Sequence, residues 1–291
     1  MDMSWEDAQT FLMVAEQRSF SGAARALGLG QPTISRRIAN TEERMGCQLF
    51  RRDKRGAELT EAGARLVPAA EQMARWAGEF DRLAAGAEAE LSGTVRIAAP
   101  PGFAVELLAP FARRARERLP DIRLEVLASV DHIDLARGGA DLAVRTRPPK
   151  EPGLMSLYSG EVELGVFASA DYAARVEKGA TLADIDWVTW AEPYEHLEPR
   201  ALLASLIPNL RPAFASDDYL VQKSAVAEGL GAMILERERH PLSRSPELVE
   251  IDVELELPPA EIHLVCATSM QFVPRVKAVA DLMIEVLLGG R

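Results

Sequence analysis

The chain has 291 residues and a formal net charge of -11, and 48% of its residues are apolar, 26% charged and 6% aromatic. This composition excludes collagen-like, low-complexity and disordered chains, and the length favours two domains, or one domain plus an added module. No apolar run reaches the roughly 20 residues of a membrane span, and acids occupy the amino terminus where a signal peptide carries bases, so we expect a cytoplasmic protein with no membrane partner.

The charge is unevenly distributed along the chain. Residues 18–56 contain nine bases and three acids, a net charge of +6, whereas residues 1–17 contain four acids and no base. Contacts to nucleic-acid phosphates need Lys and Arg to displace condensed counterions. A basic block inside an acidic chain therefore keeps nucleic-acid binding open. The two cysteines, Cys47 and Cys266, are too few for a metal cluster or a disulfide framework, and we expect reduced thiols.

Within this basic block the residue order predicts two short helices joined by a glycine turn. After an amphipathic first helix, a second helix is expected over residues 22–27 and a third from Gln31, with a turn at 28–30 between them. Ala24 is small enough for a steep helix crossing, and Gly28 can adopt a positive φ, which is helix-turn-helix geometry. The side chains that would face a DNA major groove are Ser21, Gln31, Pro32, Thr33, Ser35, Arg36 and Arg37.

A run of cations follows the third helix. Leu49 and Phe50 form an apolar anchor, and four cations then surround one acid before a closing glycine. Such a run is either a solvated charged loop or a short β-ribbon, a wing, that lies along a phosphate backbone. Its place directly after a helix-turn-helix favours the wing. The cations that would contact phosphates are Arg51, Arg52, Lys54 and Arg55.

Four segments of this region resemble the LysR-type transcriptional regulators in order and spacing. They are residues 19–27, 31–38, 49–52 and 59–63, which read SFSGAARAL, QPTISRRI, LFRR and LTEAG. Members of that family usually carry a serine at the position of Gly30, so we expect a weaker cap for the third helix here. The resemblance implies a winged helix-turn-helix domain at residues 1–60 that binds double-stranded promoter DNA, with RNA polymerase as a further candidate partner.

A heptad pattern follows this domain. Apolar residues recur at alternating steps of four and three from Ala62 to Ala87, which fits a helix packed along a partner helix and equally an amphipathic helix lying on its own domain. Pro68 predicts either a kink or the start of the helix. LysR-type regulators dimerise through a linker helix at this place, so the resemblance implies dimerisation through residues 61–90, in a homodimer that can pair further into a homotetramer. The candidate dimer contacts are Leu66, Met73, Trp76, Phe80 and Leu83.

From residue 91 onward, strand and helix patterns alternate. Strands are expected near residues 94–98, 122–128, 141–145, 162–168, 187–190, 213–215, 232–235 and 261–268, and helices near 103–118, 131–137, 217–228 and 273–288. Repeated β-α-β units imply mostly parallel sheets with helices on both faces. The expected fold class is therefore α/β with an all-α winged helix-turn-helix head.

Two segments of this region, residues 141–145 and 227–232, resemble signatures of the LysR-type effector domain, whose fold is similar to periplasmic solute-binding proteins. The resemblance implies a small-molecule effector in a cleft between two lobes. The implied organisation is an effector-binding domain at 91–291, with lobe I at about 91–161 plus 269–291, lobe II at about 162–268, and crossover strands near 161–168 and 261–268. Because open α/β sheets bind ligands at the carboxyl ends of their strands, the candidate effector contacts are Pro101, Gly102, Phe103, Ser129, Arg145, Trp190 and Ser216.

Several of these candidates have a structural alternative. Ser129 and Ser216 are equally suited to cap the helix that follows each of them. Arg145 suits an anionic effector, because a guanidinium can hold a carboxylate with two hydrogen bonds, but it adjoins a basic stretch typical of a solvated loop. The loop at residues 99–102 offers no hydroxyl, and its two prolines have no N–H, so we expect an effector less acidic than the aromatic-acid metabolites of some family members. Trp187 is expected near the cleft as well.

An enzyme is the alternative class. The sequence contains no Gly-x-Ser-x-Gly elbow, no Gly-x-x-x-x-Gly-Lys phosphate loop and no His-Glu-x-x-His pair, and its four histidines are scattered. A catalytic α/β domain fused to a DNA-binding module stays open as a mixed case, and a transport receptor would require export. We therefore expect a regulator with no enzymatic activity, cofactor or metal.

Overall fold

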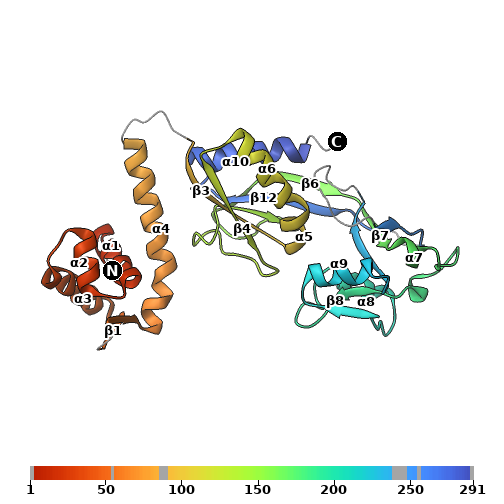
Figure 1. The fold of residues 1–291 in the computed structure, drawn as a ribbon, viewed down its shortest axis with the longest axis horizontal. Coiled ribbons are helices and arrows are strands. Elements are labelled where there is room, and N and C mark those ends of the chain that lie inside the picture. Colours follow the sequence, from red (N-terminus) through yellow and green to blue (C-terminus); the bar gives the residue numbers. More distant parts are fainter. Residues whose placement is uncertain (1–2, 54–55, 85–90, 238–247, 254–256, 289–291) are drawn as a thin grey trace. The chain divides into compact units, whose positions relative to one another are not determined.

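The computed structural model describes residues 3–53, 56–84, 91–237, 248–253 and 257–288 (Figure 1). The chain divides into two compact units, one made of residues 1–90 with 136–139 and the other of the remainder. The elements of the amino-terminal unit are α1 (Trp5–Gln17), α2 (Phe20–Leu27), α3 (Gln31–Met45), β1 (Phe50–Asp53), β2 (Gly56–Leu59) and α4 (Glu61–Ala84).

Local sequence sets the ends of the first three helices. Ser4 and Asp7 form a capping box at the start of α1, and Ser19 accepts a backbone N–H in the first turn of α2. Gly28 ends α2 with φ +65°, and Gly30 precedes α3 with no side-chain cap. The predicted helix-turn-helix, including its weak third cap, is thus confirmed.

An aromatic core holds the head, which we define as residues 3–60. Phe50 of β1 packs against Phe11 and Phe20, with ring centroids 5.4 and 6.0 Å away. Ile34 and Ile38 bury the inner face of α3 in the same core. Since burial of each such side chain stabilises the fold by about 1.5–3 kcal/mol, these contacts determine which face of α3 stays outside.

Strands β1 and β2 form an antiparallel ribbon, as the wing prediction required, and α4 begins directly after it. Thr60 accepts the Gly63 N–H at 3.0 Å. A Cβ at Gly63 would lie 2.3 Å from the Leu49 carbonyl oxygen, so only glycine fits there. This cap places the start of α4 at Glu61. Pro68 therefore lies inside the helix and does not mark its start.

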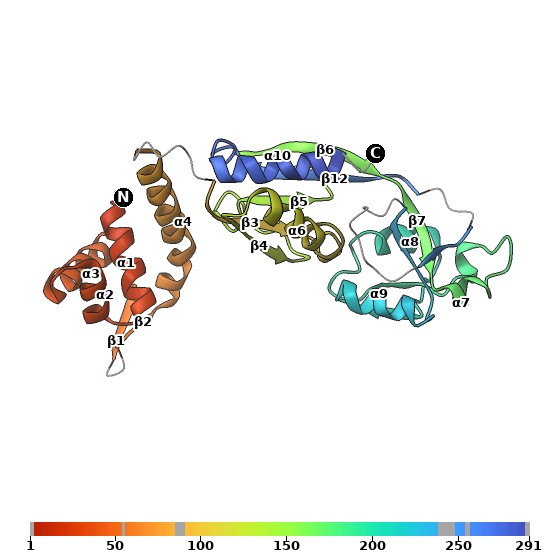
Figure 2. The same ribbon diagram turned by 45° about the horizontal axis from the view of Figure 1, so that its top comes forward.

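The second unit contains separate β-sheets (Figure 2). We use these sheets to define two lobes, lobe I and lobe II. Lobe I contains β3 (Gly93–Ala99), α5 (Pro101–Phe103), the π-helical turn η1 (Ala104–Leu108), α6 (Ala109–Arg118), β4 (Ile122–Ala128), β5 (Leu142–Arg145), β6 (Leu154–Val162), β12 (Ala260–Ala267) and α10 (Pro274–Leu288). Lobe II contains β7 (Leu164–Ala168), α7 (Ala170–Ala173), the 3-10 turn η2 (Leu182–Asp184), β8 (Val188–Trp190), α8 (Arg200–Leu206), β9 (Phe214–Ser216), α9 (Tyr219–Ala227), β10 (Ala232–Glu236) and β11 (Val249–Glu250).

The sheet of lobe I has the strand order β4-β3-β5-β12-β6. Strand β3 is parallel to β4 and β5, but β12 is antiparallel to β5 and β6. In lobe II, β7 is antiparallel to β10 and β11. Strands β8 and β9 of the same lobe are parallel. The sheets are therefore mixed rather than mostly parallel as predicted, and the lobe I sheet is mixed because the chain returns from lobe II in the opposite direction. This return also places residues 260–267 in lobe I, whereas we expected lobe II to extend to about residue 268.

The two faces of the lobe I sheet are covered differently. Helices α6 and α10 pack against each other and contact β4 and β3 (Figure 2). Residues 131–137, expected to form a helix, instead lead into a turn at 135–138. There Leu135 and Ala140 pack with Ala98 and Ala143 of the sheet. An irregular segment, rather than a helix, therefore covers this part of the sheet.

A π-helical turn interrupts the helix predicted over residues 103–118. At its end the Ala109 N–H donates to the Ala104 carbonyl, five residues back. Pro110 follows; it has no N–H, and its ring clashes with the carbonyl four residues back in a regular α-helix. The wider turn accommodates this proline, and it carries Glu106.

Candidate nucleic-acid interface and ligand-binding lobes

Helix α3 presents a polar outer face. Ile34, Ile38 and Thr41 are buried, and the side chains between them point outward. Gln31 Nε2 donates to Ser35 Oγ at 3.0 Å, which orients both groups on this face. Of the predicted DNA contacts on α2 and α3, Ser21, Gln31, Pro32 and Arg36 are exposed, and Thr33, Ser35 and Arg37 are half-buried.

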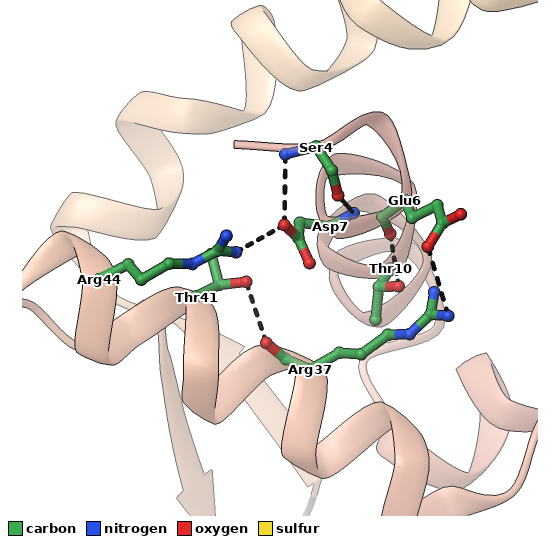
Figure 3. Close-up of polar contacts among 7 residues, drawn as sticks. All are labelled: Ser4, Glu6, Asp7, Thr10, Arg37, Thr41 and Arg44. Atoms are coloured by element: carbon green, nitrogen blue, oxygen red, sulfur yellow. Dashed lines mark hydrogen bonds and ion pairs between the residues drawn. The ribbon is translucent and has the colours of Figure 1, made fainter. Parts of the chain in front are cut away.

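Two ion pairs join α3 to α1 (Figure 3). Arg44 Nη2 lies 2.5 Å from Asp7 Oδ2, and Arg37 Nη2 lies 3.6 Å from Glu6 Oε2. Burial acts to raise the pKa of Asp7, but hydrogen bonds from Arg44 and Ser4 outweigh it and lower this pKa below its ordinary value. Arg37, a predicted DNA contact, is thus directed toward α1.

The wing carries the predicted phosphate contacts. Arg51 on β1 is exposed, opposite Glu58 of β2. Lys54 and Arg55 lie outside the described residues, as does the side chain of Arg52. The described part of the wing therefore offers Arg51 as a cation for a phosphate backbone.

The two lobes meet where α5 and η1 approach α9. Lys223 of α9 forms an ion pair with Glu106 of η1, and its ammonium lies 5.8 Å from the Tyr219 ring centroid. The Tyr219 ring covers Gly102, where a Cβ would lie 3.4 Å from it. Glu236 of β10 shares this environment, since burial and the charge of Glu106 raise its pKa to about 7 while Lys223 opposes the shift. We call Glu106, Lys223 and Glu236 the lobe-junction cluster; our sequence analysis missed all three.

The predicted anion ligand Arg145 is engaged within lobe I. Its buried guanidinium lies 3.0 Å from Glu151 Oε1 and donates to the Ile133 carbonyl at 3.4 Å. The backbone N–H of Glu151 and the Arg145 guanidinium both donate to the Glu151 carboxylate, and these hydrogen bonds lower the pKa of Glu151. The Arg145 guanidinium is therefore not part of a solvated loop, and both of its partners belong to lobe I.

Ser129, Ser216 and Trp190 are three further predicted contacts. No helix follows Ser129 directly, and Asp218, not Ser216, caps α9, although Ser216 Oγ accepts the Asp218 N–H at 3.1 Å. Both capping expectations are therefore wrong. Trp190 is half-buried and donates to the Glu198 carbonyl, whereas Trp187 is fully buried in the lobe II core and donates to the Leu182 carbonyl.

Helix α4 packs on the head along part of its length and exposes a large aromatic side chain further along. Leu66 and Met73 pack, partly buried, against the head core, as in the alternative of an amphipathic helix lying on its own domain. Trp76 is half-buried, and Phe80 is 72% exposed. The side chain of Leu83 lies outside the described residues. Phe80 is therefore the predicted dimer contact that the head leaves uncovered.

A winged helix-turn-helix, a long helix and a two-lobed α/β domain define a class of protein: a regulator with a DNA-binding module and a ligand-binding module. Two family models match accordingly, "Bacterial regulatory helix-turn-helix protein, lysR family" over residues 5–64 and "LysR substrate binding domain" over residues 88–288. The chain belongs to the LysR family. This membership confirms the expected fold class and the resemblance to the LysR family.

Individual relatives and structures agree with this assignment. An HTH-type transcriptional regulator of Xanthomonas campestris is 32% identical over 58% of this chain and 49% of its own length. Full-length OxyR from Pseudomonas aeruginosa has a TM-score of 0.70 at 18% identity, covering 99% of this chain and 96% of that one. CbnR in complex with its target DNA has a TM-score of 0.62 at 18% identity, covering 99% and 100%. The chain spans 49% to 58% of the length of four curated relatives of this kind. Among the described residues, no helix has the length and apolar character to cross a membrane.

Proposed function

We propose that the chain is a transcription regulator that binds promoter DNA as a homo-oligomer and responds to a small-molecule effector. The observation that carries this proposal is the outer face of α3, where Gln31 and Arg36 are exposed on a helix whose inner face is fixed by the head core. The complex of CbnR, a protein of similar fold, with its target DNA supports the same use of the head here. Because promoters lie on the chromosome, we propose a cytoplasmic location and RNA polymerase as a further partner.

The residues of the head divide into two proposed roles. Arg36 and Gln31 suit base edges in a major groove, because a guanidinium pairs with guanine and an amide with adenine through two hydrogen bonds each. Gln31 Nε2 has a second N–H, so the amide can pair with adenine through that N–H and Oε1 while it still donates to Ser35. Arg51 suits a phosphate, and we propose the same for Arg52, Lys54 and Arg55; Ser21, Pro32 and Thr33 would position the helix against the backbone.

Dimerisation is proposed to use the exposed part of α4. Phe80 offers a large apolar surface that a second copy of α4 would cover, and Trp76 lies one turn earlier on the helix. Two heads related by a twofold axis would then read two half-sites, which one recognition helix alone contacts too sparsely for tight binding. The homodimer is the unit this argument requires, and a homotetramer is its proposed extension.

The effector is proposed to bind where the lobes meet. Pro101, Gly102 and Phe103 belong to the helical turn that approaches α9, next to the lobe-junction cluster. We retain Trp190, Ser129 and Ser216 as candidates at strand ends. Arg145 is left out of the proposed site because Glu151 and Ile133 already occupy its guanidinium.

Selection of duplexes from a random-sequence pool by the full-length protein tests the DNA-binding function. We expect enrichment of an inverted repeat whose half-sites lie one or more helical turns of about 10 base pairs apart. Arg36→Ala should weaken binding by about 2 kcal/mol and relax the base preference at one position of each half-site. Arg65→Ala, which removes an exposed arginine from α4, is the matched control and should retain the wild-type preference. A pool that stays random at low salt would contradict the proposal.

A further inference from the structure

The two ion pairs between α1 and α3 differ in kind (Figure 3). The Asp7 carboxylate is 15% exposed, lies 2.5 Å from Arg44 and accepts the Ser4 N–H, so it is part of the packed helix junction. The Glu6 and Arg37 side chains are 71% and 32% exposed, and their nearest charged atoms are 3.6 Å apart. Exposed pairs of this geometry contribute little to stability, because water solvates each partner almost as well. Breaking the Glu6–Arg37 pair should therefore cost little free energy, so Arg37 can take another anionic partner.

The packing of α1 on α3 does not depend on the Glu6–Arg37 pair. Thr10 and Thr41 are each 1% exposed. Each hydroxyl donates to the carbonyl four residues back, Thr10 to Glu6 O at 2.7 Å and Thr41 to Arg37 O at 2.9 Å. These bonds satisfy the buried hydroxyls within their own helices, and they hold the backbone of Glu6 and Arg37 while leaving both charged side chains outside.

We propose that Glu6 sets the affinity of the chain for DNA by competing with a DNA phosphate for the Arg37 guanidinium. In the free protein Arg37 pairs with Glu6; on the duplex it turns to a phosphate and Glu6 is released to water. A guanidinium binds a phosphate with short, charge-assisted hydrogen bonds, and the contact releases condensed counterions from the DNA, so the exchange favours the complex. This inference rests on the proposed DNA-binding function and assigns Glu6 as an affinity-determining residue in a helix outside the recognition pair α2 and α3.

A simpler effect must be separated from this competition. Any carboxylate near the interface repels DNA phosphates at long range, and Glu6→Gln would remove that repulsion too. Glu16 is an exposed carboxylate on the same helix, and the described residues give it no ion pair. Glu16→Gln therefore makes the same charge change on α1 without touching Arg37. Glu6→Asp keeps the charge but shortens the side chain, so it withdraws the carboxylate from Arg37 while preserving long-range repulsion.

The experiment measures binding of the full-length variants to a fluorescently labelled duplex of mixed sequence by anisotropy over a series of salt concentrations. We expect Glu6→Gln and Glu6→Asp to tighten binding about two- to five-fold at low salt, and Glu16→Gln to change it less. Arg37→Gln should lower the slope of log K against log salt by about 1. In the Arg37→Gln background, Glu6→Gln should no longer tighten binding beyond the effect of Glu16→Gln. Thermal melting checks that every variant is folded.

Three results would overturn the proposal. Equal tightening by Glu6→Gln in the presence and absence of Arg37 would assign the effect to general repulsion. Wild-type affinity for both Glu6 variants, or tightening by Glu6→Gln but not by Glu6→Asp, would show that the local pair does not compete with DNA. Absence of duplex binding by the folded wild-type chain at low salt would instead contradict the proposed function itself.

Discussion

The head and the two-lobed domain place their charges differently. In the described part of the head the buried polar residues are two uncharged threonines, whereas the described part of the two-lobed domain buries the charged residues Asp141, Arg145, Lys223 and Arg275. Charges at the surface of the head keep most of their hydration, so they can change partner when a polyanion arrives. Charges inside the two-lobed domain have lost that hydration and depend on fixed partners.

Asp141 shows what a fixed partner does in the two-lobed domain. Its carboxylate accepts the Arg96 N–H at 2.8 Å, and its own N–H donates to the Arg96 carbonyl at 2.9 Å. These bonds join β3 to the residue that precedes β5. A buried charge therefore serves the architecture here, whereas an exposed charge of the head is free to serve recognition. The predictions below test this difference between buried and exposed charges by measuring the free energy of unfolding.

Lys223→Met should give the largest loss of stability. The substitution removes the cation from the lobe-junction cluster and leaves the Glu106 and Glu236 carboxylates together without it. Breaking a buried ion pair from one side destabilises a fold by about 3 kcal/mol. Denaturant unfolding followed by tryptophan fluorescence measures the change. Lys277→Met, which removes the cation of the exposed Lys277–Asp281 pair, is the control and should stay near wild type. Equal stability of the Lys223→Met and Lys277→Met variants would contradict the distinction between buried and exposed ion pairs.

Glu236→Gln should change stability in a pH-dependent way. The pKa of Glu236 is about 7 in the folded chain, raised from an ordinary value of 4.5, so the folded state retains a proton that the unfolded state loses. This contribution to stability is complete below about pH 4.5 and is lost as the pH rises through 7. Because glutamine stays neutral, the variant should match wild type at low pH and exceed it by up to about 3 kcal/mol above pH 7. Unfolding curves across this range measure the difference, and a constant difference would contradict the assignment.

Arg51→Ala should have the smallest effect on stability, within about 0.5 kcal/mol, because its side chain is exposed on the wing. Its effect should instead fall on DNA binding. Affinity for all duplexes should decrease, and the slope of log K against log salt should fall by about 1. Anisotropy titrations at several salt concentrations measure the slope, and an unchanged slope would remove Arg51 from the phosphate contacts.

Local signals explain why the head could be predicted in detail. Caps, the Gly28 turn and the spacing of Ile34 and Ile38 all act within a few residues, and the structure reproduces them. The direction of Arg37 was not predictable in this way, because its partner Glu6 lies on another helix. A weak signal was nevertheless present, since acids gather in α1 beside a basic recognition helix.

The lobes show the limit of the same approach. The lobe-junction cluster joins residues 106, 223 and 236, which become neighbours only after the chain has crossed from lobe I to lobe II. The pattern of the sequence predicted most of the strands of the lobes, but not β6 or β11. It did not predict the strand directions, because the reversal at β12 depends on where the chain re-enters lobe I. Lys223 stands between Gln222 and Ser224 in α9, so its immediate neighbours gave no sign that it would be buried.

The π-helical turn at Ala104–Leu108 has a consequence for how this domain tolerates changes in length. Because the turn contains one residue more than an α turn, deletion of a single residue within it would impose α-helical register on the segment and bring back the clash of the Pro110 ring that the wider turn avoids. Every side chain before the deletion would then rotate by about 100° relative to α6. The Tyr219 contact at Gly102 precedes the turn, so such a deletion would carry Gly102 away from α9 while the rest of α6 stayed in place. The extra residue of the π turn thus sets the rotation of the segment after β3 relative to helix α6.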